Sequence, residues 1–348
     1  MIEIHTKTEL TWQQHLSAAI TSLTELVRYL DLPEDLIRAG DSASQQFKLL
    51  APKPFLQRIE KGNLKDPLLL QILPHRLEDL KVAGYTKDPL AEAEHTPQKA
   101  LVHKYKSRLL VITTGVCAVN CRYCFRRHFP YGDNQLAQTE WQSVLDYLIA
   151  HPDINEVILS GGDPLIMKDA QLAQRVASLA ALPQITRLRI HSRLPVVIPQ
   201  RVNQELLDWI QASRLNIILV FHINHANEID GAVQEAANKL TAAGVTLLNQ
   251  GVILQGVNDN VSAQVSLSER LFAVGILPYY MFTFDPVAGA AHFDIDISSA
   301  QELMGQVAAE LPGYLVPRLA KEIPGKSAKT LLAPTLSNAL FIQPATVG

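Results

Sequence analysis

The chain has 348 residues, of which 47% are hydrophobic and 19% are charged, and a formal net charge of −3. A chain of this length can bury a large core, which favours one catalytic domain with appendages. The balanced charge does not indicate a protein that binds nucleic acid directly or lies on a membrane surface. No segment approaches the roughly 18–20 consecutive apolar residues that cross a bilayer, and no apolar signal core follows Met1.

The first part of the chain, residues 1–101, predicts a helical N-terminal extension. Apolar residues recur at helical spacing from Trp12 to Leu30, which predicts one helix that ends before Pro33. Shorter helix-like pieces follow, and prolines interrupt them at Pro52, Pro54, Pro67 and Pro74. We interpret this region as support for a catalytic unit and not as a catalytic domain of its own.

From residue 107 onward, apolar β-type runs alternate with amphipathic helical segments. The six runs cover residues 109–114, 156–160, 186–191, 216–222, 246–253 and 279–284. Helical patterns between them include residues 200–212, 232–243 and 263–274. Alternating strands and helices form parallel sheets with right-handed crossovers. We therefore predict an α/β fold, a partial (β/α)6 barrel over residues 102–312, followed by a short C-terminal segment, residues 313–348.

All three cysteines of the chain lie close together after the first predicted strand. Cys117, Cys121 and Cys124 have C-x3-C-x2-C spacing, and three thiolates leave one iron of a [4Fe–4S] cluster without a protein ligand. Structural zinc takes four nitrogen or sulfur ligands, and His128 is the only nearby candidate for the fourth. The spacing favours a cluster whose open iron binds a small molecule. Clustered free cysteines also indicate a reducing, cytoplasmic setting.

Polar residues follow each predicted strand, where the reactive groups of such barrels lie. Beside the cysteine loop these are Gly161-Gly162-Asp163-Pro164, His191-Ser192-Arg193, His222-Ile-Asn-His225, Asn249-Gln250 and Asp285. A single strand-end histidine or aspartate often only caps a helix. Because the carboxyl ends of all the strands meet at one rim, we expect a single site there.

The cysteine motif before a partial barrel resembles the radical SAM superfamily, and residues 100–335 are similar to the lysine 2,3-aminomutase family. The resemblance implies a [4Fe–4S] cluster that binds S-adenosylmethionine (SAM) and cleaves it to a 5′-deoxyadenosyl radical. It also implies SAM contacts from the glycine-rich motif and three later residues. These positions are Gly161, Gly162, Asp163, Arg193, His222 and Gln250. A simple strand-to-helix turn at the motif and a buried structural histidine at His222 are the structural alternatives.

The C-terminal segment resembles the part of the family that binds pyridoxal 5′-phosphate (PLP). Lys329 falls on the lysine that forms the internal aldimine with PLP, for which a primary amine is required. Lys326 is a rival in the same stretch. Lys104 and Arg108 match phosphate-binding positions, although Lys104 stands where arginine is usual and Phe282 replaces a tyrosine.

Substrate contacts follow from the same resemblance. Arg126 matches an arginine that pairs with the α-carboxylate of lysine, whereas Arg127 is expected to be a surface residue. Asp285 and Glu322 match two carboxylates that receive the ε-ammonium group, although the second is usually an aspartate. The resemblance therefore implies a radical SAM, PLP-dependent isomerase that converts L-α-lysine to β-lysine.

The catabolic aminomutases carry further cysteines for an intersubunit zinc site and a longer tail, which this chain lacks. It resembles instead the shorter bacterial EpmB branch, which makes (R)-β-lysine for the β-lysylation of elongation factor P. This implies free L-lysine as substrate, a flavodoxin or ferredoxin as reductant, and a functional link to a β-lysyl ligase. The sequence leaves open lysine already attached to a protein as the substrate instead. Whether the chain forms a homo-oligomer is left open by the sequence.

Two other functions stay open. One is a PLP-independent radical SAM enzyme that modifies a peptide or a nucleic acid, and the other is an iron–sulfur redox or sensor protein. Neither accounts for Arg126, Asp285, Glu322 and Lys329 together.

Overall fold

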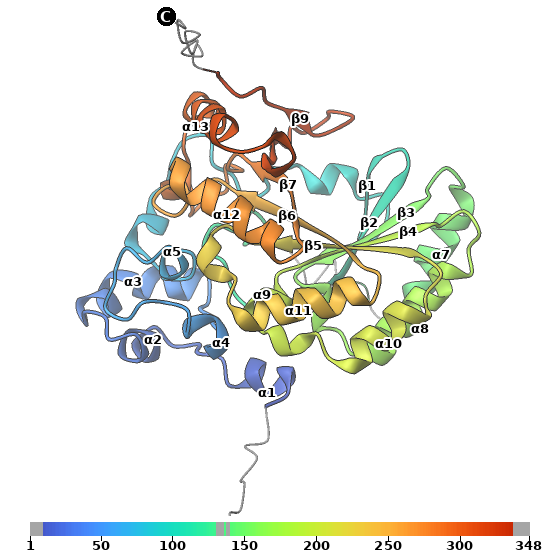
Figure 1. Cartoon of the computed structure of the whole chain (residues 1–348), viewed down its shortest axis with the longest axis horizontal. Coiled ribbons are helices and arrows are strands. Elements are labelled where there is room, and N and C mark those ends of the chain that lie inside the picture. The colour runs from blue at the N-terminus through green and yellow to red at the C-terminus, as the bar shows by residue number, and fades with distance from the viewer. Residues whose placement is uncertain (1–9, 130–135, 137–139, 337–348) are drawn as a thin grey trace, which may run out of the picture.

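The computed structural model describes residues 10–129, 136 and 140–336. Its strands form one nine-stranded sheet in which spatial order follows sequence order, with β2 to β8 parallel and β1 and β9 antiparallel at the two edges (Figure 1). The strands are β1 Leu101–Tyr105, β2 Arg108–Thr114, β3 Glu156–Gly161, β4 Arg187–Ser192, β5 Asn216–His222, β6 Thr246–Val252, β7 Leu277–Phe282, β8 Arg318–Lys321 and β9 Thr330–Leu331.

Helices connect the parallel strands and cover the outside of the sheet, so the fold is the predicted α/β barrel type (Figure 1). The helices in the barrel are α7 Trp141–Ala150, α8 Asp169–Ala180, α9 Leu194–Val197, α10 Gln204–Ala212, α11 Gly231–Ala242, α12 Val261–Ala273 and α13 Ile297–Glu310. Before the sheet lie α1 Trp12–Ser17, α2 Leu23–Tyr29, α3 Asp35–Gln46, α4 Lys53–Leu56 and α5 Pro67–Leu70.

The six predicted strands are confirmed within two residues at each end, but the sheet is larger than predicted. β1, β8 and β9 are additional, and they are short strands at or near the edges of the sheet. Parallel strands buried on both faces give long apolar runs, whereas short edge strands carry mixed residues. The domain boundaries near residues 101 and 312 stay predictions. Strands β7 and β8, which lie on either side of residue 312, belong to the same sheet.

The single helix predicted from Trp12 to Leu30 is wrong, because the structure has two. Between α1 and α2 the backbone of Ile20 pairs with that of Ala51 through two hydrogen bonds of 2.9 Å. The side chain of Ser22 then accepts from the backbone of Glu25 and starts α2. A contact with a distant segment thus replaces the helical hydrogen bonds that the local pattern predicted.

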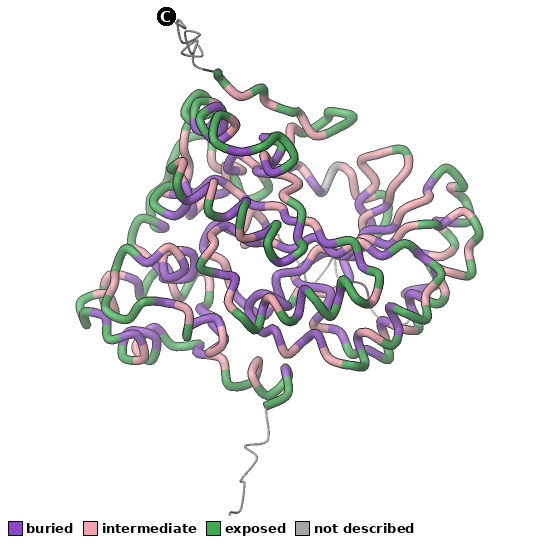
Figure 2. Tube along the Cα trace, in the orientation of Figure 1, coloured by how far each residue is buried: buried purple, intermediate pink, exposed green. Residues whose placement is uncertain are grey.

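The N-terminal extension and the barrel share one hydrophobic core. Leu26, Leu30 and Phe55 are fully buried in the same cluster of side chains as Leu159 of β3 and Leu188 of β4. Figure 2 shows that buried residues extend from the strands into the N-terminal helices, whereas exposed residues lie on the outer surface. The extension is therefore part of the scaffold that positions the site.

Candidate active site

The cysteine loop leaves the end of β2 and is held by the N-terminal extension. The backbone nitrogen of Asn120 donates to Leu50 O (3.0 Å), and that of Arg122 donates to Gln71 O (2.9 Å). Arg122 is fully buried, and its guanidinium pairs with both carboxylate oxygens of Glu78 at 2.9 and 2.5 Å. These contacts fix the conformation of the loop that carries the three thiols.

Cys117, Cys121 and Cys124 are partly buried and line the cavity described below. Burial, reinforced by the neighbouring cysteines, raises the pKa of Cys124 to about 11 and that of Cys117 well above its ordinary value. Thiols in such surroundings need a cation to ionise, and bound iron supplies that charge. The arrangement therefore fits a metal cluster.

The described residues form no zinc site with His128 as the fourth ligand. Among the described residues, no group of three or more histidine, cysteine, aspartate or glutamate side chains could hold a metal ion together. A [4Fe–4S] cluster does not require three side chains to meet at one metal ion, because each thiolate binds a separate iron. His128 is engaged elsewhere, since its Nε2 lies 2.9 Å from Ala288 O and so donates to that carbonyl.

The glycine-rich turn after β3 lies against the start of the cysteine loop. Gly161 has φ +119°, and a Cβ at Gly162 would lie 2.3 Å from Val116 O. Asp163 accepts hydrogen bonds from Ser192 Oγ (2.7 Å) and from the backbone nitrogens of Arg193 and Leu194 (2.8 Å each). The turn thus joins the ends of β2, β3 and β4 and also lines the cavity. Close packing and hydrogen bonding therefore explain its glycines and Asp163 even without a ligand.

Two histidines face the same cavity with an unsatisfied ring nitrogen. Within the described structure, Nε2 of His191 and of His222 is buried and has no hydrogen-bond partner. Burial, with Arg193 nearby, lowers the pKa of His222 to about 4, so this ring is neutral. Gln250 Nε2 lies 3.5 Å from His191 Nδ1. Buried polar atoms without partners indicate a site for a polar ligand.

Lys329 lies beside Glu322 at the C-terminal side of the cavity. Its Nζ donates to Glu322 Oε2 at 2.5 Å and lies 4.7 Å from the centre of the Phe282 ring. Tyr105 Oη donates to the other oxygen of Glu322 (2.9 Å), and Lys104 Nζ lies 3.9 Å from it. Burial opposes the ionisation of Glu322, but Lys329, Tyr105 and Lys104 together outweigh burial and lower the pKa of this carboxylate. Lys326 is exposed and does not line the cavity.

Two adjacent arginines follow the cysteine loop. Arg126 makes a bidentate ion pair with Glu92, at 2.7 and 2.6 Å, and donates to Ser160 Oγ at 3.1 Å. The expectation that Arg127 is a surface residue is wrong. Its side chain is 1% exposed and pairs with Glu78 at 2.6 Å, because that buried carboxylate serves both Arg122 and Arg127.

Asp285 lies in the cavity wall after β7. Burial, then repulsion from Glu322, raises the pKa of Asp285 to about 7, although the charge of Lys329 acts in the opposite direction. The carboxyl group is therefore only partly ionised at neutral pH. A bound cation would favour its charged form.

All the predicted site residues line one cavity of about 570 Å³. This includes the cysteines, the glycine-rich turn, Arg193, His222, Gln250, Lys104, Arg108, Arg126, Asp285, Glu322 and Lys329. Sequence reasoning did not assign Glu92, Tyr105 or Tyr280, which line it too. Glu92 lies before the first strand and belongs to no recognisable sequence motif. His191 lies at the end of a predicted strand, and we noted this position without assigning it a role.

Comparisons with known proteins agree with this arrangement. The Radical SAM superfamily profile matches residues 111–261. The L-lysine 2,3-aminomutase of Escherichia coli is 46% identical over 95% of this chain and 97% of its own length. That of Haemophilus influenzae is 47% identical over 93% and 96%. This chain belongs to the lysine 2,3-aminomutase family of radical SAM enzymes.

Membership in the lysine 2,3-aminomutase family makes the chain an isomerase and implies a [4Fe–4S] cluster and SAM, which the three thiols and the unpartnered histidines fit. The L-lysine 2,3-aminomutase of Clostridium subterminale is more distant, at 32% identity over 93% of this chain and 78% of its own length. In the described part of the chain, no helix has the length and apolar character needed to cross a membrane.

Proposed function

We propose that this protein converts free L-α-lysine to β-lysine, with SAM as the radical source and PLP as a second cofactor. The observation that carries the proposal is the set of side chains that line one cavity. These include the three cysteines, the Lys329–Glu322 ion pair and Asp285. The residues proposed to hold the radical source and those proposed to hold a diamino acid thus line the same cavity.

The residues around Lys329 fit PLP. Lys329 supplies the primary amine and Phe282 an aromatic face beside it, at 4.7 Å. Among the described residues, the guanidinium of Arg108 has no hydrogen bond or ion pair and stacks over the ring of Tyr105 at 4.0 Å, so its donors are available to a phosphate. When bound, PLP supplies an electron sink that stabilises a radical while nitrogen migrates between carbons.

The remaining charged residues fit the two ends of lysine. Arg126 offers the fork that grips a carboxylate, and Glu92 occupies it in the present structure. At the other end, Lys329 places its own ammonium on Glu322. The ε-ammonium of the substrate would take the place of the Lys329 ammonium on Glu322, beside Asp285. The charges of this chain thus complement a substrate with a carboxylate at one end and a cation at the other.

We further assign the protein to the branch that supplies (R)-β-lysine for elongation factor P. Two relatives from Escherichia coli and Haemophilus influenzae align over nearly their whole length, whereas the Clostridium subterminale enzyme extends beyond the match. This chain is also 46–47% identical to those two relatives and 32% identical to the Clostridium subterminale enzyme, which supports assignment to the branch of the first two. With it we propose a β-lysyl ligase as the consumer of the product and a flavodoxin or ferredoxin as the reductant. The free thiols support a reducing, cytoplasmic setting.

The test is an anaerobic assay of cluster-reconstituted protein with SAM, PLP, dithionite and free L-lysine, resolved by chiral chromatography. We expect (R)-β-lysine from the wild type and from K326A, which alters an exposed lysine outside the cavity. We expect at least a 1000-fold loss in K329A, on the order of the effect of removing an essential catalytic group. Full activity of K329A would contradict the PLP assignment.

The same assay separates the two other candidate functions. A PLP-independent modifying enzyme would cleave SAM and leave free lysine unchanged. A redox or sensor protein would show a reducible cluster without SAM cleavage. Either result would overturn the proposal.

A further inference from the structure

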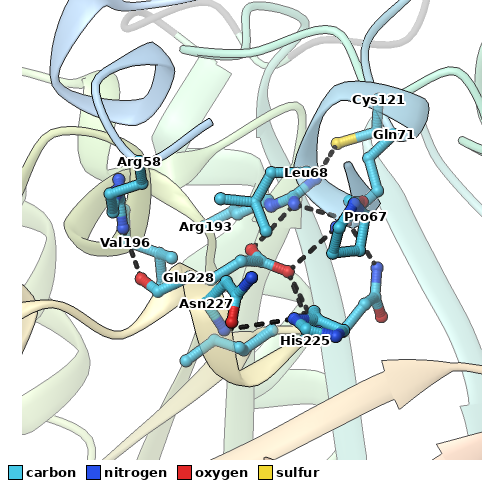
Figure 3. A network of polar contacts seen from close by, with 12 residues as sticks. Arg58, Pro67, Leu68, Gln71, Cys121, Arg193, Val196, His225, Asn227 and Glu228 are labelled. Carbon is cyan, nitrogen blue, oxygen red and sulfur yellow. Dashed lines mark hydrogen bonds and ion pairs between the residues drawn. The ribbon is translucent and has the colours of Figure 1, made fainter. Parts of the chain in front are cut away.

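Arg193 reaches from the end of β4 back to the cysteine loop (Figure 3). Its Nη1 lies 2.7 Å from Cys121 Sγ and 2.7 Å from Tyr123 Oη, and its Nη2 lies 2.7 Å from Gln71 Oε1 and 2.8 Å from Glu228 Oε2. A guanidinium has five N–H groups, so these contacts use four of them. Only the Nε–H is left for another ligand. Arg193 therefore connects the cysteine loop to Gln71 and Glu228.

Glu228 fixes the other side of this guanidinium. Its side chain is fully buried and accepts hydrogen bonds from the backbone of Asn224 (2.9 Å) and His225 (3.2 Å) and from Gln71 Nε2 (3.2 Å). A buried carboxylate with this many donors has little freedom to move. Gln71, from the N-terminal extension, and Glu228, which follows β5, thus both hold Nη2 of Arg193, while Nη1 contacts Cys121 (Figure 3).

Hydrogen bonds to the sulfurs of an iron–sulfur cluster, and charges close to it, set its reduction potential. An N–H donor with a full positive charge on a cysteine sulfur favours the state with one more electron. The negative charge of Glu228 opposes this effect but keeps the donor in place. We propose that Arg193, held by Glu228, is a positioning residue that raises the reduction potential of the cluster through Cys121. The electron itself comes from an external one-electron reductant, and no bond to Arg193 forms or breaks.

This inference requires the cluster but neither PLP nor lysine. It can therefore be tested on protein that carries only the cluster, and its failure would leave the proposed function untouched. Likewise, a chain that does not act on lysine could still show the predicted shifts in potential.

The experiment is an anaerobic redox titration of the full-length, cluster-reconstituted protein without substrate, followed by electron paramagnetic resonance. We expect R193Q to make reduction at least about tenfold less favourable, which is about 59 mV more negative for a one-electron couple. We expect E228Q to shift the potential in the positive direction, because glutamine keeps an acceptor oxygen for Arg193 but removes the negative charge that balances it. Loosening of the loop alone would move both variants in the same direction.

Arg201 provides a matched control. It is fully buried and pairs with Asp169 at 2.8 Å, the same distance as in the Arg193–Glu228 pair, and none of its contacts with described residues involves a cysteine. We expect R201Q to be less stable but to keep the wild-type potential. A potential of R193Q equal to that of R201Q would overturn the proposal. If R193Q assembles no cluster, E228Q decides the question, and an unshifted or more negative potential in E228Q would overturn it.

Discussion

At the scale of single residues, we propose that Asp285 makes substrate binding depend on pH. Its pKa is raised to about 7 by burial and by Glu322, so below pH 7 the group is mostly neutral. Only the carboxylate attracts an ammonium strongly. We expect the KM for L-lysine to fall about tenfold between pH 6 and pH 8, with a smaller change in kcat. In D285N this pH dependence should disappear, and an unchanged profile in D285N would contradict the role of Asp285.

The same pKa predicts an effect on stability. The folded protein holds the Asp285 proton more tightly than the unfolded chain, whose aspartate has its ordinary pKa of 3.8. The stabilisation from this proton is therefore lost as the pH rises from about 4 through about 7. We expect the free energy of unfolding of D285N, relative to that of the wild type, to rise by about 2–3 kcal/mol from pH 5 to pH 8. Urea unfolding of both proteins at pH 5 and pH 8, without PLP or lysine, measures this difference in free energy. The same difference at both pH values would contradict the prediction.

At the scale of elements, one buried carboxylate connects the N-terminal extension to the cysteine loop. Glu78, in the short 3-10 helix Arg76–Asp79, pairs with both Arg122 and Arg127. Removing its charge leaves two buried guanidinium groups without a counter-ion. We expect E78Q to lose about 3–5 kcal/mol of stability and to bind less than half of the wild-type iron after reconstitution.

A matched control for E78Q is E156Q. Glu156 also serves two arginines, Arg187 and Arg189, but it lies at the start of β3, at the opposite end of the strand from the cysteine loop, and is partly exposed. Urea unfolding and iron and sulfide analysis compare the two variants. Normal iron content in E78Q, or an equal loss in E156Q, would show that Glu78 does not support the loop.

These elements also show what the sequence could predict. The parallel strands were found because each is a run of apolar residues, and the strand-end residues were found because the carboxyl ends of these strands meet at one rim. Glu78 and Glu92 were not found, because their arginine partners lie 34 or more residues away and no local pattern marks them. The break between α1 and α2 was missed for the same reason, since Ala51 causes it from a distant segment. The environment of Arg127 likewise depended on tertiary contacts.

At the scale of the whole molecule, the C-terminal segment passes over the sheet edge and holds Lys329 at the cavity. β9 pairs with β8, and beyond it Thr335 N donates to Gln301 O of α13 at 2.9 Å. Gly305 allows this approach, because a Cβ there would lie 1.8 Å from Thr335 O. Alanine favours a helix interior over glycine by about 1 kcal/mol. A loss of stability on replacing Gly305 by alanine would therefore come from the clash with Thr335.

We therefore expect G305A to lose about 1–3 kcal/mol of stability and to hold PLP less well, because the segment that carries Lys329 is displaced. Thermal unfolding and absorption spectroscopy with added PLP measure the two effects. The control is G231A, at the start of α11, where an added Cβ meets nothing within 4 Å. Stability of G305A equal to or above that of G231A would contradict the role of Gly305.

The central claim for the whole molecule is that one cavity moves the amino group of lysine from the α-carbon to the β-carbon. The most direct measurement is nuclear magnetic resonance of the product from L-lysine labelled with nitrogen-15 at the α-amino group, under anaerobic turnover. We predict that the label appears on the β-carbon of the product. Label that stays on the α-carbon, or that leaves as ammonia, while SAM is cleaved, would contradict the account.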